Sequence, residues 1–208
     1  LGSGLGMKPA PERLHNLFDT AFGEDDGSSS SMDGQLTDGF LMAALQNLST
    51  AGNPLYWTLQ EFIYADGTLE QPIRWAAAHE YASRPEFSAD TRPLMLTGEA
   101  CFPWTFEDDP LLAPFKPAVD LLMEDTEFDS IYDAKQLAAN EVPLQAAVYH
   151  DDLYVDRDLS LDTLSRIGHS HAWVTNEFEH DGLHGSTVFR HIFQEALNRG
   201  DLERALQA

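Results

Sequence analysis

An acid and a histidine follow two strand-like segments near the end of the 208-residue chain. Asp152 comes after the apolar run VPLQAAVY, in the sequence YHDDLYVD, and His180 follows HAWVTNEF, in the sequence NEFEHDG. A carboxylate beside an imidazole holds that imidazole in one tautomer, so that it can act as a general base toward a serine hydroxyl. The pair therefore has the residue types of two thirds of a Ser-His-Asp triad.

The segments around this pair predict a strand, helix, strand, helix order. The strand-like runs are 142–152 and 171–180, and the helical segments are 159–167 and 186–206. This alternation is typical of an open α/β sheet with parallel strands. Because the carboxyl ends of neighbouring parallel strands meet at one edge of a sheet, we expect Asp152 and His180 to lie close together.

A nucleophile is missing from this arrangement. No segment has the Gly-x-Ser-x-Gly pattern that presents a serine on a strand-to-helix turn: LGSGLG at 1–6 has the wrong spacing, and HGST at 184–187 lacks the pattern. We therefore expect the nucleophile, the oxyanion loop and most of the sheet to lie upstream of Leu1. Without a serine to activate, the chain alone is expected to be inactive.

The earlier part of the chain is predicted to be mainly helical. The acidic, Ser/Gly-rich segment 23–34 predicts a loop, and Pro72 is expected in the first turn of one helix. We expect residues 1–125 to form a helical region and 126–208 to form the C-terminal part of an α/β domain. Helical periodicity is found at 9–22, 36–48, 54–67 (with Leu55, Leu59, Phe62 and Ile63 on its buried side), 71–84, 114–123 and 129–140.

The charge balance excludes several classes of partner. The chain has 12 basic and 35 acidic residues, a formal net charge of −23. No stripe of Lys and Arg is present to bind phosphates, which argues against nucleic acids and against anionic membranes. The single cysteine, Cys101, excludes an intrachain disulfide. No signal peptide or membrane span is evident, so we expect a cytoplasmic protein.

Several longer stretches resemble the C-terminal portion of the proline iminopeptidases (prolyl aminopeptidases), which are α/β-hydrolases with a helical cap. In this family the strand-end motif HGxxDxxVP carries the triad acid. Aligned on YHDDLYVD with Val155 at the motif's Val, that acid is Asp152, while Asp151 is one position away and Asp156 occupies the Pro position. The resembling stretches are RLHNLFDTAFGE, NPLYWTLQEFIYADG, MLTGEACFPWTFEDDPLL, VPLQAAVYHDDLYVD and AWVTNEFEHDGL.

The resemblance implies a serine peptidase that releases N-terminal proline from peptides, with His180 as the base and Asp152, or its neighbour Asp151, as the acid. It implies no cofactor and no metal. Glu61 and Glu99 lie in the cap stretches and would bind the substrate's imino group, since a cationic amine in a shielded pocket needs anions. The implied partners are a proline peptide and the missing N-terminal half of the same enzyme. Aromatic residues available to line a pocket for the proline ring are Phe102, Trp104 and Tyr64.

A metal site is an alternative interpretation of the histidines. Two histidines separated by one residue, together with nearby acids, can chelate zinc. Against this, the spacings are irregular, no HExxH motif exists, and two of the histidines precede the second strand while His180 follows it. The histidines in question are His169, His171, His180, His184 and His191.

Other functions also remain open from the sequence. A different cap-bearing α/β-hydrolase, such as a tripeptidyl aminopeptidase or a haloperoxidase, has the same overall plan. An epoxide hydrolase presents cap tyrosines to its substrate, for which Tyr56, Tyr64 and Tyr81 are available. A non-catalytic acidic module that binds a partner is the remaining alternative.

Overall fold

The computed structural model describes residues 2–22, 35–48 and 53–203. The chain divides into two compact units. The first consists of Leu1–Leu5 and Pro9–Asp129, and the second of Gly6–Lys8 and Ser130–Ala208. The predicted loop at 23–34 and the end of the predicted last helix, after residue 203, lie outside the described residues.

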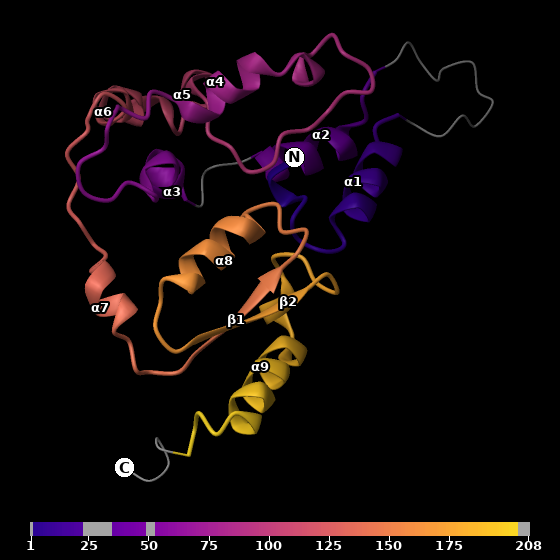
Figure 1. The fold of residues 1–208 in the computed structure, drawn as a ribbon. Coiled ribbons are helices and arrows are strands. Elements are labelled where there is room, and N and C mark those ends of the chain that lie inside the picture. Colours follow the sequence, from indigo (N-terminus) through magenta and orange to yellow (C-terminus); the bar gives the residue numbers. More distant parts are fainter. Residues whose placement is uncertain (1, 23–34, 49–52, 204–208) are drawn as a thin grey trace. The chain divides into compact units, whose positions relative to one another are not determined.

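The first unit is helical, as predicted for most of its segments (Figure 1). The helix predicted at 71–84 starts late, because Trp75 takes a left-handed conformation (φ 60°) before α4 begins at Ala76; Pro72 therefore precedes the helix. Thr37 caps α2, accepting a hydrogen bond from the Phe40 N–H through its hydroxyl (3.1 Å). The helices are α1 Ala10–Asp19, α2 Asp38–Leu48, α3 Pro54–Leu59, α4 Ala76–Ser83, α5 Pro103–Asp108 and α6 Lys116–Leu122.

The buried face predicted for the segment 54–67 is wrong for three of its four residues, while Phe62 packs against the core as predicted. Leu55, Leu59 and Ile63 are exposed, whereas Thr58 is buried. The helix ends at Leu59 and passes into a 3₁₀ helix at Gln60–Phe62, so the 3.6-residue period does not continue. The buried face of this segment is consequently different from the one that a continuous helix would bury.

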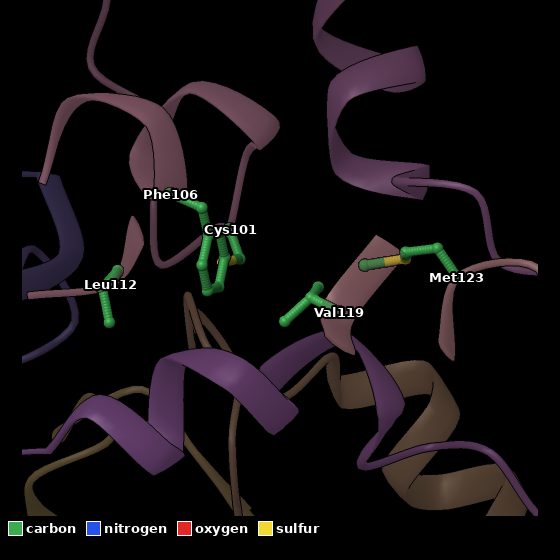
Figure 2. Close-up of a cluster of buried hydrophobic side chains, with 5 residues drawn as sticks. All are labelled: Cys101, Phe106, Leu112, Val119 and Met123. Atoms are coloured by element: carbon green, nitrogen blue, oxygen red, sulfur yellow. The ribbon is translucent and has the colours of Figure 1, made fainter. Parts of the chain in front are cut away.

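The core of the first unit lies among α5, α6 and the segments beside them. Each of its five fully buried side chains is at most 2% exposed, and Figure 2 shows them as sticks. Trp57, Phe62 and Trp75 pack against this cluster, which brings the chain around α3 and the start of α4 to it. Complete burial of one such side chain stabilises the fold by about 1.5–3 kcal/mol. The buried side chains are Cys101, Phe106, Leu112, Val119 and Met123.

The second unit contains a parallel pair of strands, β1 Leu144–Tyr149 and β2 Ser170–Thr175, paired in register from Leu144↔Ser170 to Tyr149↔Thr175. Helix α8 (Arg157–Ser165) connects the strands, and α9 (Ser186–Asn198) follows β2. The two helices lie on opposite sides of the strands (Figure 1). The predicted strand, helix, strand, helix order is confirmed, and with the helical first unit it makes the chain a mixture of helices and a small parallel sheet.

Several boundaries in this unit differ from prediction; β1 is shorter than the predicted run 142–152, and α9 ends at Asn198. Strand β2 ends at Thr175, where its pairing with Tyr149 of β1 stops, so His180 lies in a loop rather than at the last position of a strand. The helix predicted at 129–140 is short, α7 Ala134–Ala138, and begins after Asp133, whose carboxylate accepts from the N–H groups of Lys135 and Gln136. None of the helices in the described part has both the length and the apolar composition needed to cross a membrane.

Candidate active site

Asp152 and His180 are brought together by the loops that leave β1 and β2. The Nδ1 atom of His180 lies 3.0 Å from Oδ2 of Asp152. The Asp152 side chain is 6% exposed, whereas that of His180 is 43% exposed. Because β1 and β2 are parallel neighbours, both loops leave the same edge of the sheet, which explains how residues 28 positions apart meet.

The Asp152 carboxylate is held by three donors. Its Oδ1 atom accepts hydrogen bonds from the backbone N–H groups of Tyr154 (2.8 Å) and Val155 (3.0 Å), while Oδ2 accepts from the imidazole. A carboxylate acceptor requires the hydrogen on Nδ1, so the lone pair of the neutral imidazole is on Nε2. The Nε2 atom makes no hydrogen bond within the described part of the chain. His180 is therefore oriented as a base with its reactive nitrogen available.

Residues that the sequence did not point to also position His180. Its backbone N–H donates to the carbonyl of Gly6 (3.1 Å), and its ring meets the Tyr154 ring edge-on, with centroids 4.8 Å apart. A Cβ atom at Gly6 would lie 2.5 Å from Cε2 of Tyr154, so only glycine allows this approach. The segment LGSGLG is visibly glycine-rich, but the sequence alone does not show that one of its glycines contacts a residue far along the chain.

Near the pair, the phenol of Tyr149 is buried against Gly182, where a Cβ atom would collide with the Tyr149 hydroxyl. Burial, and to a smaller extent the charges of Asp152 and Asp181, raises the pKa of Tyr149. The hydroxyl has no hydrogen-bond partner among the described residues. Tyr149 is therefore a buried, neutral side chain that lines the hollow beside Asp152 and His180.

The two neighbouring acids are engaged elsewhere. Asp151 is 70% exposed and contacts Nδ1 of His150 (2.9 Å), whose Nε2 faces the guanidinium of Arg157 (2.6 Å). Asp156 caps α8 by accepting from the N–H groups of Asp158 and Leu159. The structure thus places Asp152, and neither of the other two acids, against His180.

The five histidines considered as one metal site do not come together. His169 and His171 lie at the start of β2 and His180 lies beyond its end. Six residues of strand separate the two positions by roughly 20 Å. His191 instead stacks on Trp173 (centroids 3.7 Å apart), and His184 ends a 3₁₀ helix at Gly182–His184.

In the first unit, the two predicted substrate-binding acids have different surroundings. Glu61 is half-buried and accepts from the N–H groups of Ala76 (3.0 Å) and Ala77 (3.1 Å) at the start of α4. Burial raises the pKa of the Glu61 carboxyl, and the two N–H groups oppose that shift. Glu99, also half-buried, forms no hydrogen bond or ion pair with any described residue. Of the two acids, Glu99 is therefore the one without a partner among the described residues.

Phe102 and Trp104 form a stacked pair, with ring centroids 4.4 Å apart and ring planes 7° from parallel. Tyr81 meets both rings edge-on, at 5.6 Å in each case. Phe102 is 8% exposed and Trp104 is 42% exposed, so Trp104 carries the exposed aromatic face of this pair and Phe102 packs behind it. Tyr64 is 77% exposed and has no ring contact with the described residues, so it stands apart from this pair.

Comparison with known proteins agrees with the resemblance noted in the sequence. No protein-family model matches the chain. A proline iminopeptidase of Aeromonas sobria is 39% identical over 186 residues, covering 88% of this chain and 40% of that protein. Proline iminopeptidase aneH of Aspergillus aculeatus is 33% identical over 141 residues, covering 67% of this chain and 31% of that protein. The chain thus spans less than half the length of these curated relatives, and most of it is related to them.

Proposed function

We propose that this chain, a relative of proline iminopeptidases, supplies the acid and the base of a serine peptidase that releases N-terminal proline from peptides. The observation that carries the proposal is the hydrogen bond between His180 and the buried Asp152, which leaves Nε2 of His180 without a hydrogen bond in the described part. The names of the two relatives supply the substrate class. An α/β-hydrolase fold with a helical cap over residues 1–125 is part of the same proposal.

The proposed mechanism assigns each proton. The nucleophile is a serine in the part of the enzyme that this chain does not include. Its hydroxyl attacks the carbonyl carbon of the N-terminal prolyl residue, and Nε2 of His180 takes the hydroxyl proton. Asp152 stabilises the imidazolium that forms. His180 then gives the proton to the leaving amine, and a water molecule, activated in the same way, hydrolyses the prolyl ester and releases proline.

We also propose that carboxylates of the first unit bind the substrate's charged imino group. Glu99 is the stronger candidate because it has no partner among the described residues, whereas Glu61 already accepts two backbone hydrogen bonds. The exposed ring of Trp104, with Phe102 stacked behind it, offers a flat surface for the proline ring. A cation in a shielded site requires such an anion, since an unpaired buried charge costs several kcal/mol.

The remaining sheet of the enzyme is the partner that we propose for the second unit. Among the described residues, β1 pairs only with β2, so its other edge presents unpaired backbone groups. A hollow of about 370 Å³ lies beside this strand and is lined by Tyr149, Asp152 and His180, among others. Further strands of the same protein, carrying the serine, would cover this edge and complete the site.

The test uses the full-length natural protein that contains this chain. Its hydrolysis of a proline arylamide is compared with its hydrolysis of an alanine arylamide. We expect preference for the proline substrate and a loss of kcat of about 10³-fold or more in His180→Ala. His184→Ala changes a histidine a few residues away and should retain activity. Equal activity of the two variants would contradict the role of His180, and absence of proline preference would contradict the substrate class.

A further inference from the structure

A second cluster of chemically active side chains lies at the start of β2. His169, His171 and Asp201 each place one ligand atom within 4.8 Å of the others. The rings of the two histidines meet nearly at right angles (82°), with centroids 5.9 Å apart. Because this cluster lies at the opposite end of β2 from the loop with His180, it belongs to no part of the proposed active site.

Local backbone geometry fixes these positions. His169 takes a left-handed conformation (φ 52°), which is uncommon for a residue with a side chain and is tolerated where surrounding structure holds it. Asp201 follows Gly200 (φ 75°) in a turn that ends α9, in which the N–H groups of Gly200 and Asp201 donate to the carbonyls of Leu197 and Ala196 (3.0 Å each). This turn places Asp201, which follows α9, next to His169 at the start of β2.

The hydrogen bonds around the cluster leave two acceptors facing each other. Nδ1 of His169 lies 2.9 Å from the carbonyl oxygen of Glu141, which can only accept, so its hydrogen is on Nδ1. Nε2 of His169 then faces Oδ1 of Asp201 at 3.2 Å, and a carboxylate oxygen is also only an acceptor. A cation is needed between these two atoms: either an additional proton on the imidazole or a metal ion.

The other contacts favour a metal ion over a proton. Oδ2 of Asp201 accepts from the side chain of Gln145 (2.8 Å), which in turn accepts from Arg199 (2.8 Å), so the carboxylate is held with Oδ1 toward the histidine. Residues that bind metal ions are usually oriented in this way, by hydrogen bonds from neighbouring groups. The side chain of His171 is half-buried, makes no hydrogen bond within the described part, and brings a third donor atom that an ion pair would not need.

We propose that His169, His171 and Asp201 bind a divalent transition-metal ion of the zinc class, with water completing its coordination. Two imidazole nitrogens and one carboxylate oxygen form a ligand set that zinc accepts at bond lengths of about 2.0–2.2 Å. The Asp201 side chain is 7% exposed and that of His169 is 38% exposed, so an ion can enter from the histidine side. The ion would join the end of α9 to the start of β2 and stabilise the second unit.

The experiment uses the full-length natural protein that contains this chain, after EDTA has removed bound metal. Zinc chloride is then titrated into the protein in a calorimeter. We expect one zinc ion per chain and a rise in Tm on binding. His171→Ala and Asp201→Asn should each weaken zinc binding by at least about tenfold and abolish the rise in Tm. Asp201→Asn can keep its hydrogen bond with Gln145, so a folding defect in His171→Ala would still leave one usable variant.

His184→Ala is the matched control, because His184 lies outside the cluster and should leave zinc binding unchanged. Circular dichroism of each variant without metal checks that it is folded. Absence of saturable zinc binding would overturn the proposal and leave the cluster as a His–Asp ion pair. Zinc binding of equal strength in the folded His171→Ala and Asp201→Asn variants would overturn it as well, because the ion would then be held elsewhere.

Discussion

Asp152 differs from the acids beside it by what its oxygens contact. Two backbone N–H groups and the His180 imidazole surround its carboxylate, while Asp151 contacts His150 and Asp156 caps a helix. The sequence favoured Asp152 as the acid next to His180 and kept Asp151 as the alternative. Side-chain direction after the end of a strand depends on the local turn, which residue spacing alone does not define.

At the residue scale, Glu99 and Glu61 provide a contrast. Glu99→Gln removes a carboxylate that has no partner among the described residues, so its proposed role is substrate binding alone. We expect kcat/KM for a proline arylamide to fall about 30-fold, mainly through KM, because losing one partner of a desolvated charge pair costs about 2 kcal/mol or more.

Urea unfolding of Glu99→Gln should match that of the wild type. Glu61→Gln is the comparison, since this carboxylate accepts two N–H groups at the start of α4 and its loss should lower the free energy of unfolding. An unchanged KM in Glu99→Gln would show that Glu99 does not bind the imino group.

At the element scale, the short segment Gly6–Lys8 belongs with the second unit, where it contacts the loop that carries His180. The carbonyl of Gly6 accepts from His180, and Lys8 donates to the carbonyl of Glu177 (3.2 Å). These long-range contacts could not be predicted from the periodicity of apolar residues, because that periodicity shows only which face of a single helix or strand is buried. The same limit explains the error on α3, where a change of helix type altered the buried face.

We expect Gly6→Ala to lower kcat/KM by about tenfold to a hundredfold. The new methyl group would lie 2.5 Å from the Tyr154 ring, and the ring that contacts His180 would have to move. Displacement of a catalytic group by about 1 Å is sufficient for a loss of this size.

Gly4→Ala is the matched control, because a Cβ atom at Gly4 meets nothing within 4 Å. Its kcat/KM for the proline arylamide should equal that of the wild type. If Gly6→Ala also retains full activity, the contact between the Gly6 segment and the His180 loop has no part in positioning the base.

At the scale of the whole molecule, the order of strands and helices in the second unit and the helical character of the first were predictable, because apolar periodicity and short β-branched runs report on burial directly. The net charge of −23 limits the partners but does not identify the reaction. The relatives extend well beyond the region they share with this chain. The activity that we propose is therefore one of the whole protein, and the proposed contribution of this chain is the acid–base pair of Asp152 and His180.

That pair is tested most directly by comparing Asp152→Asn with Asp151→Asn in the protein of natural length, by measuring kcat/KM for a proline arylamide. Asparagine at position 152 keeps the size of the side chain but does not enforce the imidazole tautomer with its lone pair on Nε2, so we expect a loss of about 10³–10⁴-fold. Asp151→Asn should stay within about twofold of the wild type, since Asp151 is exposed and its carboxylate contacts His150 instead of His180. A large loss in Asp151→Asn, with Asp152→Asn near full activity, would contradict the pairing of Asp152 with His180 as the acid and base of this enzyme.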